Sequence, residues 1–335
     1  MFQQTNRREF LKQTSSLLGA GAVASVVPYS GTSAGAAESK AAEVEDKAVP
    51  VVDTHHHLWD LRKLHLPWLK NEAVQPINRS YLMADYLRAT QGLNVVKTVY
   101  MEVNVHPSQQ AKEADYVIEL CRRNDNPMVA AVIGGFPQEK TFKSYISKYA
   151  QNKYIRGVRT VLHDADRPKG LCLQPRFIEN IKLLGKLGLS FDLCMRADEI
   201  LDGVRLAEKC PQTRFVIDHC GNMSVTSKDK KLRSAWKQGI KAAAGLENTV
   251  CKISGIVVTT EKGNWKPFDL APNMNFCMET FGEDRAYFGG DWPVCTLKAT
   301  FVQWLDALKS IVRDRSLEFK RKLFHDNAVK FYSLS

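Results

Sequence analysis

Two histidines separated by one residue, His55 and His57, follow an apolar run at residues 49–52. Such a run predicts a short buried strand. Alternate side chains of a strand share a face, so His55 and His57 are expected on one side and His56 on the other. Two imidazoles side by side at a strand end can hold one transition metal ion, because neutral imidazole is a good ligand for such ions. The simpler alternative is a pair of surface histidines in a polar turn.

Polar side chains also stand where the other predicted strands end. Burying polar groups without partners is costly, so packing alone gives no reason to place them there. Their convergence at one end of a sheet predicts an enzyme. Beside the two histidines they are Glu102, Arg159, His163, Asp192, Arg196, His219, Ser254 and Asp291.

A structural role is the alternative for each of the main candidates. His219 could pair with the preceding aspartate or a backbone carbonyl as a core histidine. Asp291 could cap the helix that follows it, as aspartate often does. Glu102 could simply be solvated at a strand end, and Arg159 could form an ion pair with Asp192.

The elements that must position these residues alternate along the chain. Helical sequence is expected after the strands, at 80–91, 109–123, 138–150, 175–187, 198–209, 228–246, 267–281, 298–312 and 316–325. Eight strands with helices between them predict an α/β fold, a closed (β/α)8 TIM barrel with its site at the C-terminal strand ends. An open doubly wound sheet is the alternative, but no glycine-rich loop follows the first strand. The strands are expected at 49–52, 95–101, 128–133, 155–161, 189–193, 214–217, 249–254 and from 286.

The connection at 58–79 is too apolar for a simple tether. A loop of this length in a compact domain is usually functional. It carries Trp59 and Trp68, and Trp292 follows the eighth strand. These tryptophans could belong to the core or form a wall of a sugar pocket.

Residues 1–36 have the three-part layout of a cleavable export signal. The pair Arg7-Arg8 indicates the twin-arginine (Tat) route, and a small-residue site at 34–36 follows a weakly apolar run. That run is too short to span a bilayer comfortably. We therefore expect a flexible linker at 37–47, a single domain at 48–335, and a periplasmic or secreted protein. The alternative for the leader is an ordinary basic amphipathic helix.

The chain carries a formal net charge of +11 and eight cysteines. The basic residues are scattered rather than arranged in a stripe with aromatics, which argues against nucleic-acid binding. A modest positive field favours an anionic small-molecule substrate. The cysteines include no Cys-x-x-Cys pair, which excludes the common zinc-ribbon spacing. Export would permit a disulfide, and the sequence leaves the oligomeric state open.

Five motifs spread over 51–335 resemble the amidohydrolase superfamily. They are most similar to its branch of TIM-barrel metal-dependent hydrolases, which includes lactonases for L-fucono- and L-rhamnonolactones. The fifth strand departs from the binuclear members, because it offers Asp192 and Cys194 instead of histidine or modified lysine. The motifs are His55-x-His57, Arg156-Gly-Val-Arg159, Val216-Ile-Asp-His219, Lys252-Ile-Ser254-Gly and Phe288-Gly-Gly-Asp291-Trp-Pro.

The resemblance implies a hydrolase that opens a sugar lactone with one divalent ion, Zn or Mn, although the family also has members that work without metal. Asp291 would take a proton from the attacking water, and the ion or His219 would polarise the carbonyl. A decarboxylase or an amide hydrolase of a small cyclic or aromatic acid is the main alternative, and a non-catalytic sugar-acid-binding barrel is the other. The implied metal ligands are His55, His57, Glu102 and Asp291, and the implied substrate-binding residues are Arg159, Arg156, His163, Trp59, Trp68 and Trp292.

Overall fold

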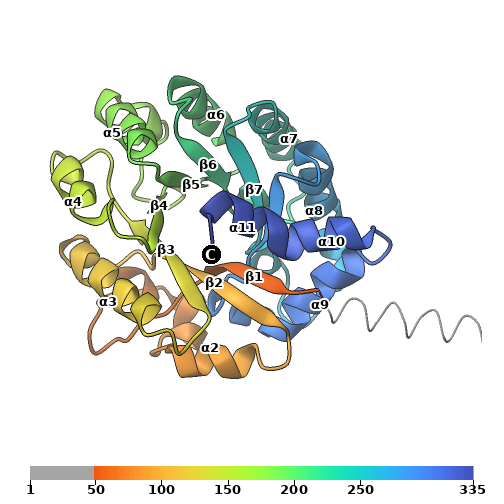
Figure 1. The fold of residues 1–335 in the computed structure, drawn as a ribbon. Helices are drawn as coiled ribbons and strands as arrows, with labels where there is room; N and C mark the ends of the chain where they lie inside the picture. The colour runs from red at the N-terminus through yellow and green to blue at the C-terminus, as the bar shows by residue number, and fades with distance from the viewer. Residues whose placement is uncertain (1–48, 335) are drawn as a thin grey trace, which may run out of the picture. The chain divides into compact units, whose positions relative to one another are not determined.

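The computed structural model describes residues 49–334, so the predicted leader and linker lie outside the described residues. Eight parallel strands follow one another around a single sheet in the order of the chain (Figure 1). This arrangement confirms the predicted (β/α)8 barrel. The strands are β1 (Val51–His56), β2 (Val95–Met101), β3 (Met128–Gly134), β4 (Ile155–Val161), β5 (Ser190–Cys194), β6 (Arg214–Ile217), β7 (Thr249–Ile253) and β8 (Ala286–Phe288).

The barrel closes between β8 and β1. The amide of Asp291 donates to the carbonyl of His55 at 2.6 Å, and the amide of His57 donates to the carbonyl of Trp292 at 2.7 Å. These bonds lie just beyond the end of β8, so closure itself brings Asp291 next to the two histidines. The open-sheet alternative is therefore excluded.

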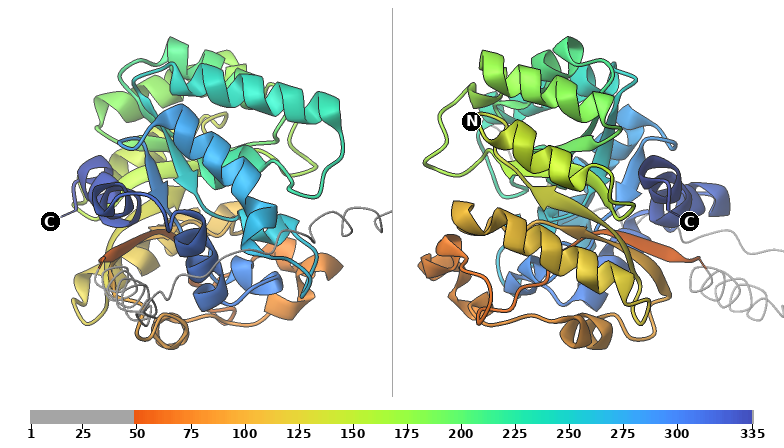
Figure 2. Two further views of the ribbon diagram at one scale, coloured as in Figure 1. Left: turned by 90° about the vertical axis from the view of Figure 1, so that its right-hand side faces the viewer. Right: turned by 60° about the vertical axis from the view of Figure 1, so that its left-hand side comes forward.

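Helices surround the sheet on its outer side, where their apolar faces bury the outward side chains of the strands (Figures 1 and 2). Local sequence sets several of their ends. Pro175 opens α5, and Thr300 caps α9, where its hydroxyl accepts from the Gln303 amide at 3.1 Å. The helices are α2 (Met83–Ala89), α3 (Gln110–Arg122), α4 (Phe142–Tyr149), α5 (Pro175–Lys186), α6 (Ile200–Lys209), α7 (Lys230–Ala244), α8 (Pro267–Phe281), α9 (Phe301–Ile311), α10 (Leu317–Arg321) and α11 (Asn327–Tyr332).

The N-terminal half of the barrel interior is an apolar core that α11 closes. Tyr332 packs there with inward residues of the strands such as Val99, Val216, Val250 and Tyr287. Figure 1 shows α11 lying across the barrel opening, and Figure 2 shows it from the side. We call this region the lower interior.

Basic side chains at the starts of three strands hold the segment that includes α11. Arg214 of β6 donates to the carbonyl of Phe331, Lys97 of β2 to that of Leu334 at 3.4 Å, and Arg156 of β4 to that of Ser333 at 3.5 Å. The segment is therefore fixed to the end of the barrel where the strands begin.

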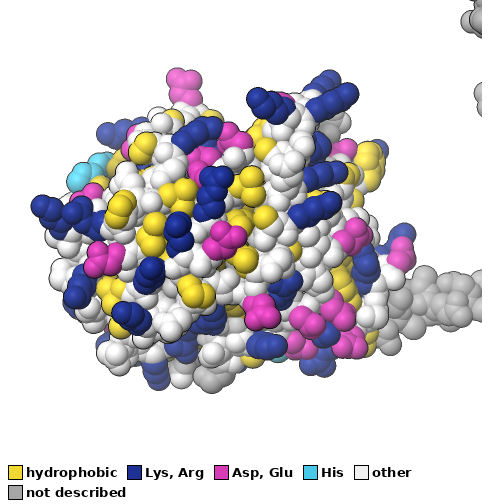
Figure 3. All heavy atoms as spheres, turned by 90° about the horizontal axis from the view of Figure 1, so that it is seen from above, with side chains coloured by type: hydrophobic (Ala, Val, Ile, Leu, Met, Phe, Trp, Pro, Cys, Tyr) yellow, Lys and Arg dark blue, Asp and Glu magenta, His cyan; other side chains and the backbone are white. Residues whose placement is uncertain are grey.

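Charged side chains of both signs share one face of the barrel (Figure 3), and the cysteines of the described residues are buried. On the face seen in Figure 3, Lys and Arg side chains are interspersed with Asp and Glu. All eight cysteines fall within the described residues, and all are free and buried. Among residues 49–334, no helix combines the length and the apolarity that crossing a bilayer requires.

Candidate active site

A cavity of about 230 Å³ opens at the C-terminal ends of the strands. This is the end of a TIM barrel at which active sites lie. The cavity brings together six of the residues that the sequence singles out, from four different strands or the loops after them. They are His57, Trp68, Arg159, His163, His219 and Asp291.

The end of β1 presents its histidines through an irregular register. The pairing of β1 with β2 shifts between Asp53 and His56, and such a bulge changes which side chains face inward. The rings of His55 and His57 lie 4.9 Å apart, on the cavity side. The His56 ring lies on the other side, 4.6 Å from the ring of Tyr86. The predicted alternation of the three histidines is confirmed.

Asp53, which was not among the residues singled out from the sequence, links the end of β1 to the segment after β8. Its Oδ1 accepts from the amides of Gly290 at 2.7 Å and His55 at 3.0 Å, and its Oδ2 accepts from the Tyr86 hydroxyl at 2.7 Å. A Cβ atom at Gly290 would lie 2.7 Å from Asp53 Oδ2. Glycine is therefore needed at 290 for β8 to approach β1 this closely.

Three buried ligand atoms form a group that fits one metal ion: Nε2 of His55, Nε2 of His57 and Oδ1 of Asp291. Asp291 Oδ1 lies 3.7 Å from His55 Nε2 and 3.3 Å from His57 Nε2. Tetrahedral ligands about 2.1 Å from zinc stand about 3.4 Å apart. The donor set of two imidazoles and one carboxylate also matches a catalytic zinc site that keeps a position open.

The tautomer of His57 supports the same conclusion. Its Nδ1 lies 2.9 Å from the carbonyl of Met101, which can only accept, so Nδ1 carries the hydrogen. In neutral His57 the Nε2 lone pair then faces the Asp291 carboxylate. Two acceptors at this distance require a cation between them, either a proton or a metal ion.

Asp291 is held in an uncommon backbone conformation. Its φ is +53°, in the left-handed region that side chains other than glycine rarely adopt. The helical turn that follows, Val294–Leu297, has no side-chain cap, so the capping role considered from the sequence is wrong. A strained residue whose carboxylate faces two histidines points to function.

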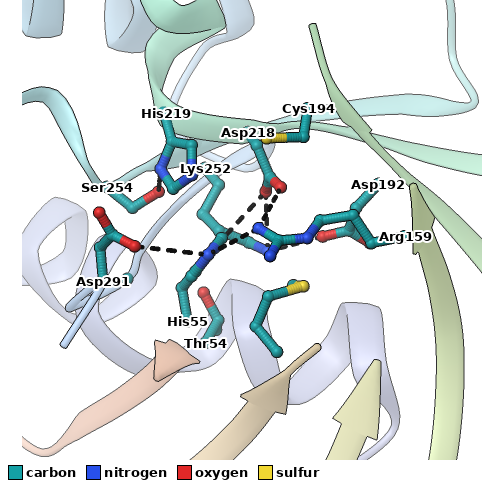
Figure 4. A network of polar contacts seen from close by, with 12 residues as sticks. Thr54, His55, Arg159, Asp192, Cys194, Asp218, His219, Lys252, Ser254 and Asp291 are labelled. Atoms are coloured by element: carbon teal, nitrogen blue, oxygen red, sulfur yellow. Dashed lines mark hydrogen bonds and ion pairs between the residues drawn. The ribbon is translucent and has the colours of Figure 1, made fainter. Parts of the chain in front are cut away.

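His219 follows β6 in a run of four left-handed residues, with φ values of 54°, 52°, 71° and 55° at 219–222. Its Nδ1 lies 2.9 Å from the Ser254 hydroxyl, and its ring lies 4.5 Å from that of His55 (Figure 4). A Cβ atom at residue 255 would come within 2.1 Å of Nδ1, so Gly255 makes room for the ring. Burial lowers the pKa of His219, which keeps the imidazole neutral near pH 7. His219 is therefore not a core histidine that pairs with Asp218, which was the structural alternative considered from the sequence.

A charged layer, which we call the upper interior, lies beneath these groups. Lys252, fully buried, donates to Asp192 at 2.7 Å and lies 3.0 Å from Asp218 (Figure 4). Burial acts to lower the pKa of Lys252, but the two aspartates raise it above its usual value. Burial acts to raise the pKa of Asp218, but Lys252 and His55 hold it well below its usual value. Asp218 Oδ1 lies 3.6 Å from His55 Nδ1, so the layer supports the histidine from below.

Arg159 pairs with Glu102 rather than with Asp192. Its Nε donates to Glu102 Oε1 at 2.7 Å, and its Nη2 donates to the Glu102 carbonyl at 2.7 Å. Burial acts to lower the pKa of Arg159, but Glu102 raises it above its usual value. Glu102 Oε2 accepts from the Asn104 amide at 2.6 Å. With both oxygens engaged, Glu102 lies outside the metal-binding group in which the sequence placed it.

Three residues expected to bind substrate do not line the cavity. Arg156 lies at the opposite end of the barrel, because it stands at the start of β4, three residues before Arg159. Trp59 is fully buried, and its indole donates to the carbonyl of Arg79 at 2.6 Å. Trp292 packs against Tyr81 and Tyr86.

Besides Arg159, two residues expected to bind substrate line the cavity. Trp68 comes from the short helical turn Pro67–Lys70 in the long connection after β1, where its indole donates to the carbonyl of Val103 at 2.8 Å. His163 lies with Nδ1 3.3 Å from the Cys194 sulfur. Burial raises the pKa of the Cys194 thiol, so it remains protonated and can donate to His163. That bond leaves Nε2 of His163 for the cavity.

The family model for amidohydrolases matches residues 52–334. An uncharacterised protein of Sinorhizobium fredii is 27% identical over 304 residues, covering 85% of this chain and 98% of that protein. An L-fucono-1,5-lactonase of Burkholderia ambifaria is 26% identical over 293 residues, covering 84% of this chain and 95% of that protein. The crystal structure of an amidohydrolase from Burkholderia multivorans with bound zinc superposes with a TM-score of 0.76 at 19% identity, covering 85% of this chain and all of that one.

The structural likeness, at this low identity, supports the fold. The family match supports more, because it extends over nearly all of the described residues and includes His55, His57, His219 and Asp291. By this match and by the barrel that carries these residues, the chain belongs to the amidohydrolase family.

Proposed function

We propose that the protein hydrolyses the ring ester of a small sugar-derived lactone with one divalent ion, zinc or manganese, held by His55, His57 and Asp291. The observation that carries the proposal is the group of three buried ligand atoms, of which those of His57 and Asp291 belong to residues that line the cavity. The sugar lactonases among the relatives support the choice of a lactone. A cavity of about 230 Å³ suits a single small ring.

The roles of the residues follow from their free atoms. With a divalent ion held by these three ligands, the ester carbonyl would be polarised. Asp291 uses Oδ1 in its contacts with both histidines, so Oδ2 remains to accept a proton from the attacking water. His219 is fixed through Nδ1 by Ser254, and its Nε2 is left to donate to the carbonyl oxygen.

The remaining walls would bind the rest of the ring. His163 offers a nitrogen to a hydroxyl or carboxylate oxygen, and Trp68 provides an aromatic surface. Asn104 donates to Asp164 at 2.9 Å, and both residues belong to the lining. Val258 and Val294 add apolar surface to the lining. The cavity would therefore offer both polar and apolar contacts to a ring.

A hydrolysis screen over aldono- and uronolactones, combined with metal analysis of the purified protein, tests the proposal. We expect turnover of at least one lactone and about one equivalent of zinc or manganese. The double variant His55→Ala/His57→Ala should remain folded but lose the metal. The matched control His65→Ala/His106→Ala, which removes an exposed stacked pair of histidines, should keep it.

The competing activities give different results in the same assays. Release of carbon dioxide from a small carboxylic acid, without lactone opening, would identify a decarboxylase instead. Cleavage of an amide would identify an amide hydrolase. Tight binding of lactones with no turnover in the presence of zinc or manganese would identify a non-catalytic barrel.

A further inference from the structure

The guanidinium of Arg159 is anchored along one edge by Glu102, and its other edge is hydrogen-bonded to His55 with Asp218 further away. Nε and Nη2 both donate to Glu102, at 2.7 Å each. Nη1 lies 3.1 Å from Nε2 of His55 and 3.6 Å from Asp218 Oδ2. Arg159 is among the residues that line the cavity. Its Nη1 is therefore the one nitrogen whose partner can change while the side chain stays in place.

The contact between Arg159 and His55 determines which atom of His55 accepts. Arginine has donors only, so Nη1 must donate and Nε2 of His55 must accept. The hydrogen of a neutral His55 then lies on Nδ1, toward Asp218 at 3.6 Å. The accepting Nε2 is also the atom that faces Asp291 at 3.7 Å in the metal-binding group.

One lone pair cannot serve a guanidinium and a metal ion at the same time. We propose, on the basis of the proposed function, that Arg159 Nη1 and the ion compete for His55 Nε2, so that ion binding releases Nη1 to an oxygen of the substrate. The two bonds to Glu102 hold the guanidinium in the cavity wall throughout. Arg159 is thus a positioning residue for His55 without the ion and an oxygen-binding residue with it.

The release makes two binding events cooperative. A carboxylate or hydroxyl oxygen entering the cavity meets a free charge-assisted donor only after the ion has taken His55. By linkage, an oxygen ligand that binds Nη1 stabilises the ion-bound state in return. The substrate class that uses this arrangement is a lactone with an oxygen acceptor beyond the ester itself, as in an aldono- or uronolactone.

Zinc affinity, measured by competition with a chromophoric chelator, tests the competition independently of catalysis. A hydrogen bond between a charged and a neutral buried group contributes about 1.5–3 kcal/mol, so its removal should tighten zinc binding about tenfold to a hundredfold. Arg159→Lys keeps the positive charge and the pairing with Glu102 but lacks Nη1. Arg159→Lys and Arg159→Met should therefore both bind zinc more tightly than the wild type.

Two further variants control for charge and for folding. Arg196→Met removes a cation that pairs with Glu199 at 2.6 Å and does not contact His55, and it should leave zinc affinity close to that of the wild type. Arg159→Met/Glu102→Gln removes the buried pair together, so that Glu102 is not left charged without a partner and cannot become a ligand itself. This double variant should also bind zinc more tightly.

The outcomes separate this inference from the proposed function. A wild type that takes up no zinc or manganese would overturn the single-metal proposal and the inference with it. A wild type that binds zinc, with affinity unchanged in Arg159→Lys, would overturn the inference alone, even if Arg159→Met binds more tightly through loss of charge. At saturating zinc, Arg159→Lys should raise KM for the best lactone, and an unchanged KM would show that Nη1 does not bind the substrate.

Discussion

The lower and upper halves of the barrel interior are built from the same strands but from opposite kinds of side chain. In the lower interior, β6 and β7 contribute Val216 and Val250. Two residues further along the chain, Asp218 just after β6 and Lys252 of β7 belong to the upper interior. Because side chains at i and i+2 share a face of a strand, one step along the barrel axis changes an apolar layer into a charged one.

The difference shows what each layer requires. The lower interior needs matched volume, which α11 completes with Tyr332. The upper interior needs matched charge, because an unpaired buried ion costs several kcal/mol. Its cations therefore lie against carboxylates, Lys252 against Asp192 and Arg159 against Glu102. Substitutions in the lower interior should therefore act through packing, and substitutions in the upper interior through charge.

The largest effect is expected at the rim of the upper interior, from Asp291→Asn. General base catalysis is typically worth 10²–10⁴-fold, so turnover should fall by about that factor. The change is nearly isosteric, and stability measured by denaturant unfolding should change little. Normal kcat on the best lactone would contradict the proposed mechanism at its centre.

Next in size is Lys252→Met. It leaves Asp192 and Asp218 buried without their cation, and breaking a buried pair in this way costs about 3–5 kcal/mol of unfolding free energy. Urea unfolding measures the loss. The double change Lys252→Met/Asp192→Asn removes one of the stranded charges, so it should be more stable than the single variant. A double variant as unstable as the single one would show that lost packing, not charge, controls this layer.

A smaller effect is expected from Tyr332→Phe in the lower interior. It removes the contact between the hydroxyls of Tyr332 and Tyr287, which lie 3.3 Å apart, and keeps the volume of the ring. The loss of one neutral hydrogen bond should cost about 1 kcal/mol of unfolding free energy. The kcat should stay at the wild-type value, because the change lies at the far end of the barrel from the cavity. A large fall in kcat would mean that the two layers are not independent.

A pH-dependent effect is expected from Glu113 of α3, a buried carboxyl outside the barrel wall. Its Oε1 accepts from the Tyr100 hydroxyl at 2.9 Å and from the Val103 amide at 2.7 Å. Burial and the nearby Glu102 raise its pKa from 4.5 to about 8. Stability from this group is therefore fully present below pH 4.5 and is lost as the pH rises through about 8.

Glu113→Gln should remove that dependence, since an amide can accept the same two bonds without ionising. Unfolding free energies at pH 6 and pH 9 measure the difference. In the wild type the value should fall between the two pH values more than in the variant. Equal falls in both proteins would show that Glu113 does not carry the effect.

Most of the fold could be predicted from sequence because the strands are apolar runs separated by amphipathic helices. The strands at 95–101, 155–161 and 214–217 and the helix at 267–281 have the predicted bounds. The expected helix at 316–325 is instead divided between α10 and a π-helical turn, Lys322–Asp326, that leads into α11. Such a change of helical pitch has no clear signal in the spacing of apolar residues.

The site was predictable where a residue type stands at a strand end, as with His55, His57 and Asp291. Partners were less predictable, because they come from strands distant in sequence. Arg159 meets Glu102 from a strand 57 residues away, and this pairing removes Glu102 from the metal-binding group. Lys252 could have been noticed as a lysine inside the apolar run of β7, where a buried charge requires a partner.

The predictions that Arg156, Trp59 and Trp292 line the cavity were wrong for a different reason. Arg156 and Arg159 lie on one strand, but they stand near opposite ends of it, and only Arg159 reaches the cavity. Trp59 and Trp292 stand in motifs next to site residues, yet both side chains pack into the aromatic cluster around Tyr81. Neighbourhood in sequence does not tell which way a large side chain points once the chain leaves the strand.

The seal that α11 makes at the base of the barrel also bears on how the protein is synthesised. The strands it covers are complete by residue 288, whereas Tyr332 and Leu334 occupy the interior only after another 44 residues or more have been made. Without that segment, the apolar side chains of the lower interior lack the cover that α11 provides. Lys97, Arg156 and Arg214 have their backbone carbonyl partners in residues 331–334 only once that segment lies against the barrel. Desolvation of the lower interior therefore depends on residues that follow the last strand in the chain.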